Sequence, residues 1–448
     1  MRAIPRDPSP DSTLAFLLDG YRFISTRCDR YGSDVFQTRL LFEPTICLRG
    51  AEAARIFYDT ERFQRSGAIP GRAQKSLFGV DGVQVLDGAA HRVRKRLLLS
   101  LMTPDRTGEV ADRFGQRWRS AVDDWARRGT VVLHDEVAEL LCRTACEWVG
   151  IPLPEKEAPL RTADLTAMIK GPAAVGPTYW RGRRARRRGE RWVGGWLDAV
   201  RAGACRTPAG SGLQVIGEHR EPDGRLLDRK VAAVELLNLL RPMVAVSRYI
   251  AFAALALHRQ PRWRDRLRDS DEDVELFVQE VRRFFPFFPA AAALVRRDFD
   301  WAGYHFPRGR RVLLDVYGTN RDPRLWPRPG VFDPDRFRNW RGSPFTFIPQ
   351  GGGDHLLGHR CPGEWLTIDL MKVAVAAMTR WMTYEVPAQD LRVDGMPAGV
   401  HSGMILSAVR PAAARPPPDA PMAVPSTASS HGTLRGMAGA FLLLTEPC

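Results

Sequence analysis

One apolar stretch of helical length, LLNLLRPMVAVSRYIAFAALALH at residues 236–258, requires a long helix in the interior of this protein. The stretch carries Arg241 and Pro242 side by side near its start. A proline inside a helix costs about 3 kcal/mol and displaces the carbonyl group four residues earlier, here that of Asn238. A buried charge without a partner adds a further penalty. We therefore expect that something in the folded protein offsets both costs.

Hydrophobic periodicity predicts a mainly α fold with minor β structure. Helices are expected at Thr13–Tyr31, Ala51–Thr60, His91–Thr103, Arg113–Arg128, Glu136–Val149, Lys230–His258, Glu272–Phe284 and Glu364–Met382. Strands are expected at Val35–Leu41, Thr45–Leu48 and Arg311–Asp315. Residues 318–363 are rich in Pro, Gly, Asn and Asp, and irregular segments of that length are usually functional. Residues 410–448 are Pro-rich and are expected to form a mobile tail.

The charge balance of the 448 residues is basic, with a net charge of +15. Of the 66 basic residues, 60 are Arg and they are scattered along the chain without a nucleic-acid-binding motif, so no nucleic-acid partner is expected. The densest cluster, Arg181–Arg188, is interpreted as a solvated helix start, the alternative being contact with an acidic partner or a membrane surface. No signal-type segment and no transmembrane segment are expected, which favours a cytoplasmic protein.

The seven cysteines form no CxxC pair, so neither a disulfide framework nor a zinc site is expected. Cys361 follows a glycine-rich stretch and precedes a predicted helix. The helix N-terminus, His359 and Arg360 are expected to lower the pKa of this thiol and favour the thiolate. A thiolate there could be a nucleophile or a metal ligand, and a structural role is the alternative.

Two further motifs precede Cys361 in the chain. Glu280 and Arg283 form an ExxR on a predicted helix, and Arg336 lies in PDRF, a PxRF motif. With CPG at Cys361, these motifs occur in the order and at about the spacing seen in cytochromes P-450, and the chain resembles that family over about residues 10–405. The resemblance implies a single cytochrome P-450 domain over residues 1–409, helix-rich with a small β-sheet subdomain.

This resemblance also implies a cofactor, haem b, held between a long distal helix and a proximal Cys loop. Cys361 would be the axial ligand of the haem iron. Glu280, Arg283 and Arg336 would form a buried ion network with a structural function. The haem propionates need cationic partners, and Arg65, His91 and Lys95 match the positions that fill this role in the family.

Two departures from the common family pattern narrow the resemblance. The seventh residue before Cys361 is Asp354 where most members have Phe, and the apolar helix lacks the usual acid–alcohol pair that relays protons to O2. In both departures the chain resembles one subgroup of the family, the fatty-acid peroxygenases, which use hydrogen peroxide and need no reductase. Segments SLFGV at 76–80, LDGAAHRVRK at 86–95 and VGPTYWRGRRAR at 175–186 also resemble that subgroup.

This narrower resemblance gives Arg241 a partner, because its guanidinium can hold a fatty-acid carboxylate in a two-pronged hydrogen-bonded pair. The carboxylate would then act as the general acid–base for peroxide, and hydroxylation would fall on the α or β carbon. Pro242 would open the helix and aim Arg241 into the pocket. The cavity for the acyl chain would be lined by Phe78, Gln84, Ile69, Ile169, Phe287 and Phe288.

Gln84 favours hydroxylation, because subgroup members that decarboxylate fatty acids to terminal alkenes tend to have His at this position. Decarboxylation remains an alternative. A second alternative is an O2-dependent monooxygenase that receives electrons from ferredoxin, with Arg181–Arg188 as its docking surface. A third alternative is a non-catalytic haem-binding protein. Chain length, the ratio of α to β products and oligomeric state stay open.

Overall fold

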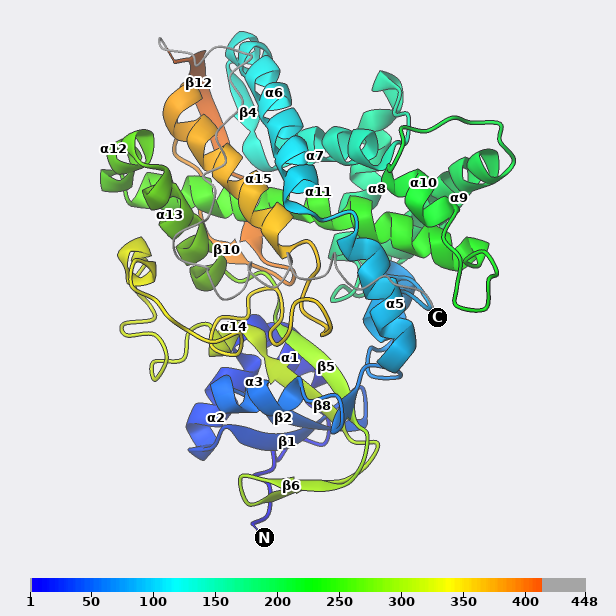
Figure 1. The fold of residues 1–448 in the computed structure, drawn as a ribbon. Helices are drawn as coiled ribbons and strands as arrows, with labels where there is room; N and C mark the ends of the chain where they lie inside the picture. Colours follow the sequence, from blue (N-terminus) through cyan, green and yellow to red (C-terminus); the bar gives the residue numbers. More distant parts are fainter. Residues whose placement is uncertain (1, 413–448) are drawn as a thin grey trace.

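The computed structural model describes residues 2–412. The expected tail beyond residue 412 therefore lies outside the described part. Figure 1 shows a helical body on one side and a smaller region around a β-sheet on the other, with the N-terminus at the sheet end. The mainly α fold with minor β structure is confirmed.

The helical body contains most of the longer helices. The α-helices are α1 Thr13–Asp19, α2 Phe23–Tyr31, α3 Ala51–Phe57, α4 Gly71–Ala73, α5 Gly88–Leu99, α6 Pro104–Arg128, α7 Leu133–Val149, α8 Ala158–Lys170, α9 Pro177–Arg201, α10 Gly212–Gly217, α11 Arg229–Arg259, α12 Arg262–Asp269, α13 Asp271–Phe284, α14 Val316–Thr319 and α15 Glu364–Ala376. Shorter turns are η1 Gly20–Arg22, η2 Gln74–Phe78, η3 Val83–Val85, η4 Glu155–Glu157, η5 Pro334–Phe337 and η6 Ala377–Trp381.

Helix α11 is the predicted apolar helix, and it runs unbroken from Arg229 to Arg259. It begins at Asp228, whose side chain accepts the backbone N–H groups of Lys230 and Val231. By length and composition it could cross a membrane, but 89% of its most apolar window is buried inside the protein, where it packs on α7, α8, α9 and α15. Pro242 does not end the helix. Of the expected opening at this residue, the structure shows only the local loss of one backbone N–H donor.

Two other predicted helices differ from expectation. The predicted helix Thr13–Tyr31 is divided at Gly20, whose φ of 56° leaves the right-handed helical region, so η1 separates α1 from α2. Helix α15 ends at Ala376, and the wider turn η6 leads directly into a strand at Met382. Helix α6 begins at Pro104, before the predicted start at Arg113. Helices α4, α8, α10, α12 and α14 were not predicted, and α9 was expected only as a helix start at Arg181–Arg188.

The larger sheet has five strands in the order β1-β2-β8-β5-β3. These strands are β1 Val35–Leu40, β2 Glu43–Leu48, β8 Arg311–Asp315, β5 Ala290–Val295 and β3 Phe63–Gln64. Strands β2 and β8 are parallel, and the other neighbours pair antiparallel. The three predicted strands are present, whereas β3 and β5 were not predicted.

A second sheet has the order β4-β12-β9, with β4 Thr130–Val132, β12 Ile405–Pro411 and β9 Met382–Glu385. Strand β12 continues past residue 409, the expected end of the domain. Two hairpins complete the strands, one from β6 Phe299–Trp301 and β7 Tyr304–Phe306, the other from β10 Val393–Asp394 and β11 Gly399–Val400.

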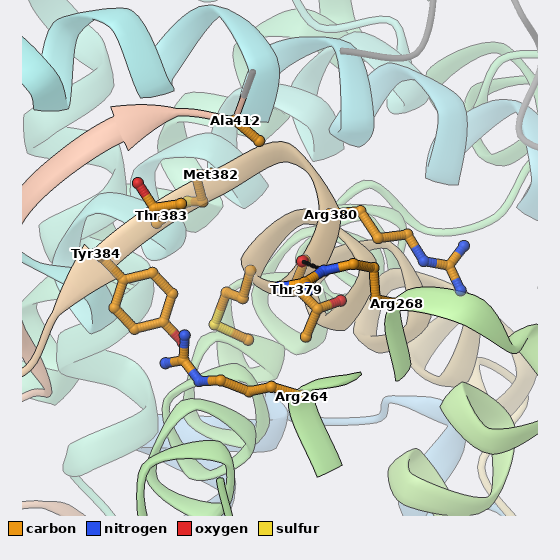
Figure 2. Close-up of a pocket in the computed structure, with 9 residues that line it drawn as sticks. Arg264, Arg268, Thr379, Arg380, Met382, Thr383, Tyr384 and Ala412 are labelled. Atoms are coloured by element: carbon orange, nitrogen blue, oxygen red, sulfur yellow. Dashed lines mark hydrogen bonds between the residues drawn. The ribbon is translucent and has the colours of Figure 1, made fainter. Parts of the chain in front are cut away.

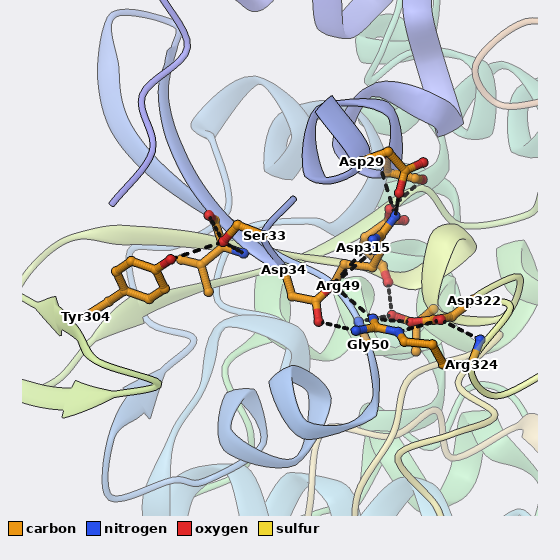
Figure 3. A network of polar contacts seen from close by, with 12 residues as sticks. Asp29, Ser33, Asp34, Arg49, Gly50, Tyr304, Asp315, Asp322 and Arg324 are labelled. Carbon is orange, nitrogen blue, oxygen red and sulfur yellow. Dashed lines mark hydrogen bonds and ion pairs between the residues drawn. The ribbon is translucent and has the colours of Figure 1, made fainter. Parts of the chain in front are cut away.

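A polar network ties the larger sheet to the irregular segment that follows it, as Figure 3 shows. Arg49 pairs with Asp29 and Asp34. Arg324 pairs with the same Asp34, at 2.6 Å, and with Asp322 at 2.5 Å. These pairs connect the end of β2 to the residues after α14, which lead into the Cys361 loop.

Candidate active site

Cys361 lies in the loop before α15, where it contacts Gln350 of the same irregular segment, residues 318–363. Its backbone N–H donates to the Gln350 carbonyl (3.1 Å), and the Gln350 side-chain amide lies 3.9 Å from its sulfur. Helix α15, which follows this loop, packs on α11, and a Cys361 thiolate would raise the pKa of Arg241 on that helix. The loop therefore places the thiol near the long central helix.

The expectation of a lowered thiol pKa at Cys361 is wrong for the protein alone. Burial raises the pKa of Cys361, and the nearby Glu364 carboxylate raises it further, whereas Lys95 opposes both. Arg360 is engaged with Glu364 (2.6 Å), and burial lowers the pKa of His359 far below its usual value, so His359 is neutral. Of the two predicted residues, His359 therefore adds no positive charge, and the Glu364 carboxylate offsets that of Arg360.

Arg65, His91 and Lys95 are all buried beside this loop. The Lys95 ammonium donates to the carbonyls of Gly358 (3.0 Å) and Arg360, and the His91 ring contacts that of His359 in a tilted arrangement with centroids 3.9 Å apart. Arg65 donates to the Ala292 carbonyl (2.7 Å) and lies over the Phe57 ring. Burial lowers the pKa of Lys95 to about 8 and that of His91 to about 4.

Within residues 2–412, Arg65, His91 and Lys95 form no ion pair with a carboxylate. Pro242 is exposed, although Arg241 and Met243 on either side of it are buried, so α11 has an open face at this point. These residues fit haem: the Cys361 thiol could bind its iron, and the exposed helix face at Pro242 could lie against the ring. The haem propionates would supply the anions that the buried cations lack.

Arg241 is 5% exposed and uses its guanidinium on neutral acceptors. It donates to the Leu77 carbonyl and to Asn238 Oδ1 (3.4 Å), and it lies 5.8 Å from the Phe78 ring centroid. Burial, and then the charge of Arg186, lower its pKa to about 9. No carboxylate forms an ion pair with Arg241 in the described part of the chain, so an anionic ligand would relieve its desolvation.

Gln84 is connected to Arg241 through a residue that was not predicted. Asn238 Nδ2 donates to Gln84 Oε1 (3.3 Å) and to Glu235 Oε2 (3.0 Å). Glu235 is fully buried and is paired with Arg94 at 3.0 Å. Glu235, Asn238 and Arg241 recur every three residues of an otherwise apolar helix, and this spacing could have identified the polar face.

The predicted acyl-chain residues are not all brought together. Phe78 lies beside Arg241, and Phe287 stacks on Tyr249 of α11 with centroids 4.0 Å apart. Phe288 is 37% exposed, and Ile169 is partly buried against the main core. The Ile69 carbonyl accepts the Gln74 side-chain amide (2.8 Å).

A pocket of about 260 Å³ between α12, η6 and β9 contains none of the predicted site residues. Figure 2 shows it, with Arg264 beside the Tyr384 ring and Arg268 and Arg380 at its edge. Its lining comes from α12, from η6 and β9, which follow α15, and from Ala412. The pocket is therefore separate from the candidate site.

Glu280, Arg283 and Arg336 meet in a buried ion cluster behind the Cys361 loop. Arg283 donates to both oxygens of Glu280 (2.6 and 2.7 Å), and Arg336 Nε lies 3.2 Å from the same carboxylate. The backbone N–H of Asp333 also donates to Glu280 (2.8 Å). The cluster joins α13 to the segment around η5.

Comparisons with known proteins agree with this arrangement. The Cytochrome P450 family model matches residues 272–398. The structure of cytochrome P450SP alpha (CYP152B1) in complex with (R)-ibuprofen has a TM-score of 0.88 and 47% identity, covering 90% of this chain and 99% of that one. Cytochrome P450EX alpha (CYP152N1) with myristic acid has a TM-score of 0.87 and 42% identity, covering 92% of this chain and 100% of that one.

Curated relatives match over shorter segments. Cytochrome P450 84A4 of Arabidopsis thaliana is 32% identical over 146 residues, which is 30% of this chain and 27% of the relative. The chain spans 24–35% of the length of the first three such relatives.

Proposed function

This chain belongs to the cytochrome P450 family, and from that premise we propose that it is a haem-thiolate peroxygenase that hydroxylates long-chain fatty acids with hydrogen peroxide. Haem b is the family's cofactor; Cys361 would hold its iron, and Arg65, His91 and Lys95 would hold its propionates. The chemistry that this group supplies is peroxide activation at a thiolate-ligated iron.

The observation that carries the proposal is the buried Arg241, which has only neutral hydrogen-bond partners in the described part of the chain. Two solved relatives bind carboxylic acids, myristic acid in one and (R)-ibuprofen in the other. A fatty-acid carboxylate at Arg241 would form a charge-assisted pair in a place where water is excluded. The proposed substrate is therefore recognised by its head group.

Arg241 would hold the carboxylate where an acid–alcohol pair is missing from α11. The carboxylate would accept a proton from hydrogen peroxide and return it to the departing oxygen, which leaves as water. One C–H bond of the substrate is replaced by C–O(H), so the reaction consumes one peroxide and yields one hydroxy acid and one water. Because the head group is anchored, the α or β carbon would react, and Pro242 leaves the Asn238 carbonyl without its helical N–H donor beside Arg241.

Gln84 supports hydroxylation over decarboxylation to a terminal alkene, since its amide cannot supply a proton as an imidazolium can. Its hydrogen bond from Asn238 also places it in the same polar group as Arg241. Phe78, Ile69, Ile169, Phe287 and Phe288 remain proposed acyl-chain contacts. We further propose that no reductase is required and that the protein acts in the cytoplasm.

The test is to mix purified haem-loaded protein with myristate and hydrogen peroxide, without any reductase, and to analyse the products by mass spectrometry. We expect 2- or 3-hydroxymyristate, and Arg241→Gln should reduce its formation by about 100-fold or more. Arg248→Gln, which replaces another buried arginine of the same helix, is the control and should retain activity. Activity that requires ferredoxin and O2, a terminal-alkene product, or no turnover at all would contradict the proposal in favour of one of the three alternatives.

A further inference from the structure

A second arginine, Arg186 of α9, lies beside Arg241 although the two are far apart in sequence. It belongs to the Arg181–Arg188 cluster, and the interpretation of that cluster as a solvated helix start is wrong at this residue, which is 1% exposed in the middle of α9. Arg186 Nε donates to Glu190 Oε1 (2.6 Å), and Nη1 donates to the Leu77 carbonyl (2.9 Å). Its Nη2 is buried and has no hydrogen-bond partner among the described residues.

The Leu77 carbonyl is the acceptor that Arg186 and Arg241 share. Arg241 Nη1 donates to the same oxygen, so one neutral carbonyl group is contacted by two buried guanidinium groups. This approach depends on Gly79, because a Cβ atom there would collide with Arg186 Nη2 and with Val234. The φ of Gly79, +86°, also favours glycine at this turn.

Neither guanidinium group contacts a fully buried carboxylate among the described residues. Glu190 pairs with Arg186 but is partly exposed, so solvent weakens its effect. Glu235, the buried carboxylate nearby, is paired with Arg94, which also pairs with Glu221, and Glu235 acts on Arg186 and Arg241 only through space. A neutral carbonyl group cannot compensate two cations, and the charge of Arg186 lowers the pKa of Arg241. Direct contacts therefore compensate the two guanidinium groups incompletely, and an entering anion would stabilise them.

We propose that Arg186 is a positioning residue for Arg241: it holds the Leu77 carbonyl and adds the second positive charge that makes the anchor selective for an anionic head group. The inference rests on the proposed function, because the anion is the fatty-acid carboxylate. Arg241 Nη2, which lies 3.4 Å from Asn238 Oδ1, is the weakly engaged N–H group that is available to the carboxylate. A neutral head group gains nothing from the second charge.

The proposal predicts opposite effects of two substitutions on the binding of myristate. Arg186→Gln keeps a donor for the Leu77 carbonyl but removes the charge, and should weaken myristate binding about tenfold. Glu190→Gln removes the anion that partly neutralises Arg186, and should strengthen binding about threefold, less so at high salt. Affinity for 1-tetradecanol, which has a similar chain and no charge, should stay within about twofold in both variants.

Binding is measured by titrating the Soret shift of the haem-loaded protein and, independently, by calorimetry. Arg187→Gln, which removes an exposed charge next to Arg186, is the matched control and should bind myristate as the wild type does. Unchanged myristate affinity in Arg186→Gln, or equal losses for myristate and 1-tetradecanol, would overturn the proposal. If Arg186→Gln does not load haem, Glu190→Gln decides: tighter myristate binding supports the proposal, and unchanged or weaker binding overturns it.

Failure of this proposal is distinguishable from failure of the proposed function. The wild-type protein tests the function by forming hydroxymyristate from peroxide, whatever Arg186 does. The Arg186 and Glu190 variants test only how the carboxylate is held.

Discussion

At the scale of single residues, Asp315 is a carboxyl group buried at the end of β8, with 1% of its surface exposed. It accepts hydrogen bonds from the Gly318 N–H (2.6 Å) and from the Ser25 hydroxyl (2.9 Å), as Figure 3 shows in part. Burial outweighs both bonds and raises its pKa to about 7. The folded protein therefore keeps a proton on Asp315 that the unfolded chain would lose near pH 4.

This raised pKa predicts how stability depends on pH. Between about pH 4 and 7 the folded state binds more protons at Asp315 than the unfolded state does, so the contribution of Asp315 to the free energy of unfolding falls as pH rises through this range and levels off above it. The contribution amounts to roughly 2–4 kcal/mol. Burial lowers the pKa of His91 and of His359, so these two side chains contribute a slope of opposite sign below about pH 6.5. Asp315→Asn keeps an acceptor for Gly318 and should give a more positive slope than the wild type in urea unfolding measured from pH 4 to 8.

The exposed Asp394→Asn variant is the control for this experiment, and its slope should match that of the wild type. An unchanged slope in Asp315→Asn would show that the carboxyl group titrates alike in both states.

At the scale of elements, α11 continues through a proline at the point where its face is open. Pro242 lacks an N–H group, so the Asn238 carbonyl loses its helical partner one turn earlier. The helix survives because both of its sides are packed against α7, α8, α9 and α15, and packing on this scale outweighs a local defect of about 3 kcal/mol. This defect lies beside Arg241 and lowers the stability of the helix. We attribute its presence to the function proposed for Arg241.

Replacing this proline should stabilise the helix. Pro242→Ala restores the N–H group and introduces the best helix former, so the free energy of unfolding should increase by about 1–3 kcal/mol. Urea unfolding of the haem-loaded protein measures the change. Pro261→Ala, at the exposed start of α12, should change it by less than about 1 kcal/mol. A loss of stability in Pro242→Ala would mean that the helix geometry at this position suits proline alone.

At the scale of the whole molecule, the Glu280 cluster connects parts of the chain that are distant in sequence. One carboxylate contacts Arg283, Arg336 and the backbone at Asp333, and thereby fixes α13 against the segment that leads to the Cys361 loop. Arg283 also donates to the carbonyls of Asn320 and Pro329, at 3.1 and 3.2 Å. Removing the carboxylate would leave two cations without compensation in the interior.

Glu280→Gln is therefore expected to lower the free energy of unfolding by about 3–5 kcal/mol. Glu272 lies on the same helix as Glu280 and forms an exposed ion pair with Arg338. Glu272→Gln breaks this pair and should lower the free energy of unfolding by less than about 1 kcal/mol. Guanidinium unfolding monitored by circular dichroism compares the two variants. Similar losses in both would contradict a special role for the buried cluster.

Local patterns were sufficient for much of this protein. The period of apolar residues predicted α11 to within one residue at each end, and it predicted β1, β2 and β8, because a helix or strand that buries one face repeats that face in its own residues. The ordered motifs around Glu280, Arg336 and Cys361 indicated the family, since each motif is a short segment of chain.

Tertiary structure alone decided which charges meet and what they do. Residues 77, 186 and 241 come together only because η2, α9 and α11 pack on one another, and nothing in the Arg181–Arg188 cluster distinguishes the buried Arg186 from its exposed neighbours. The raised pKa of Cys361 has the same origin, because desolvation depends on every element around the thiol, whereas the sequence displays only its neighbours along the chain.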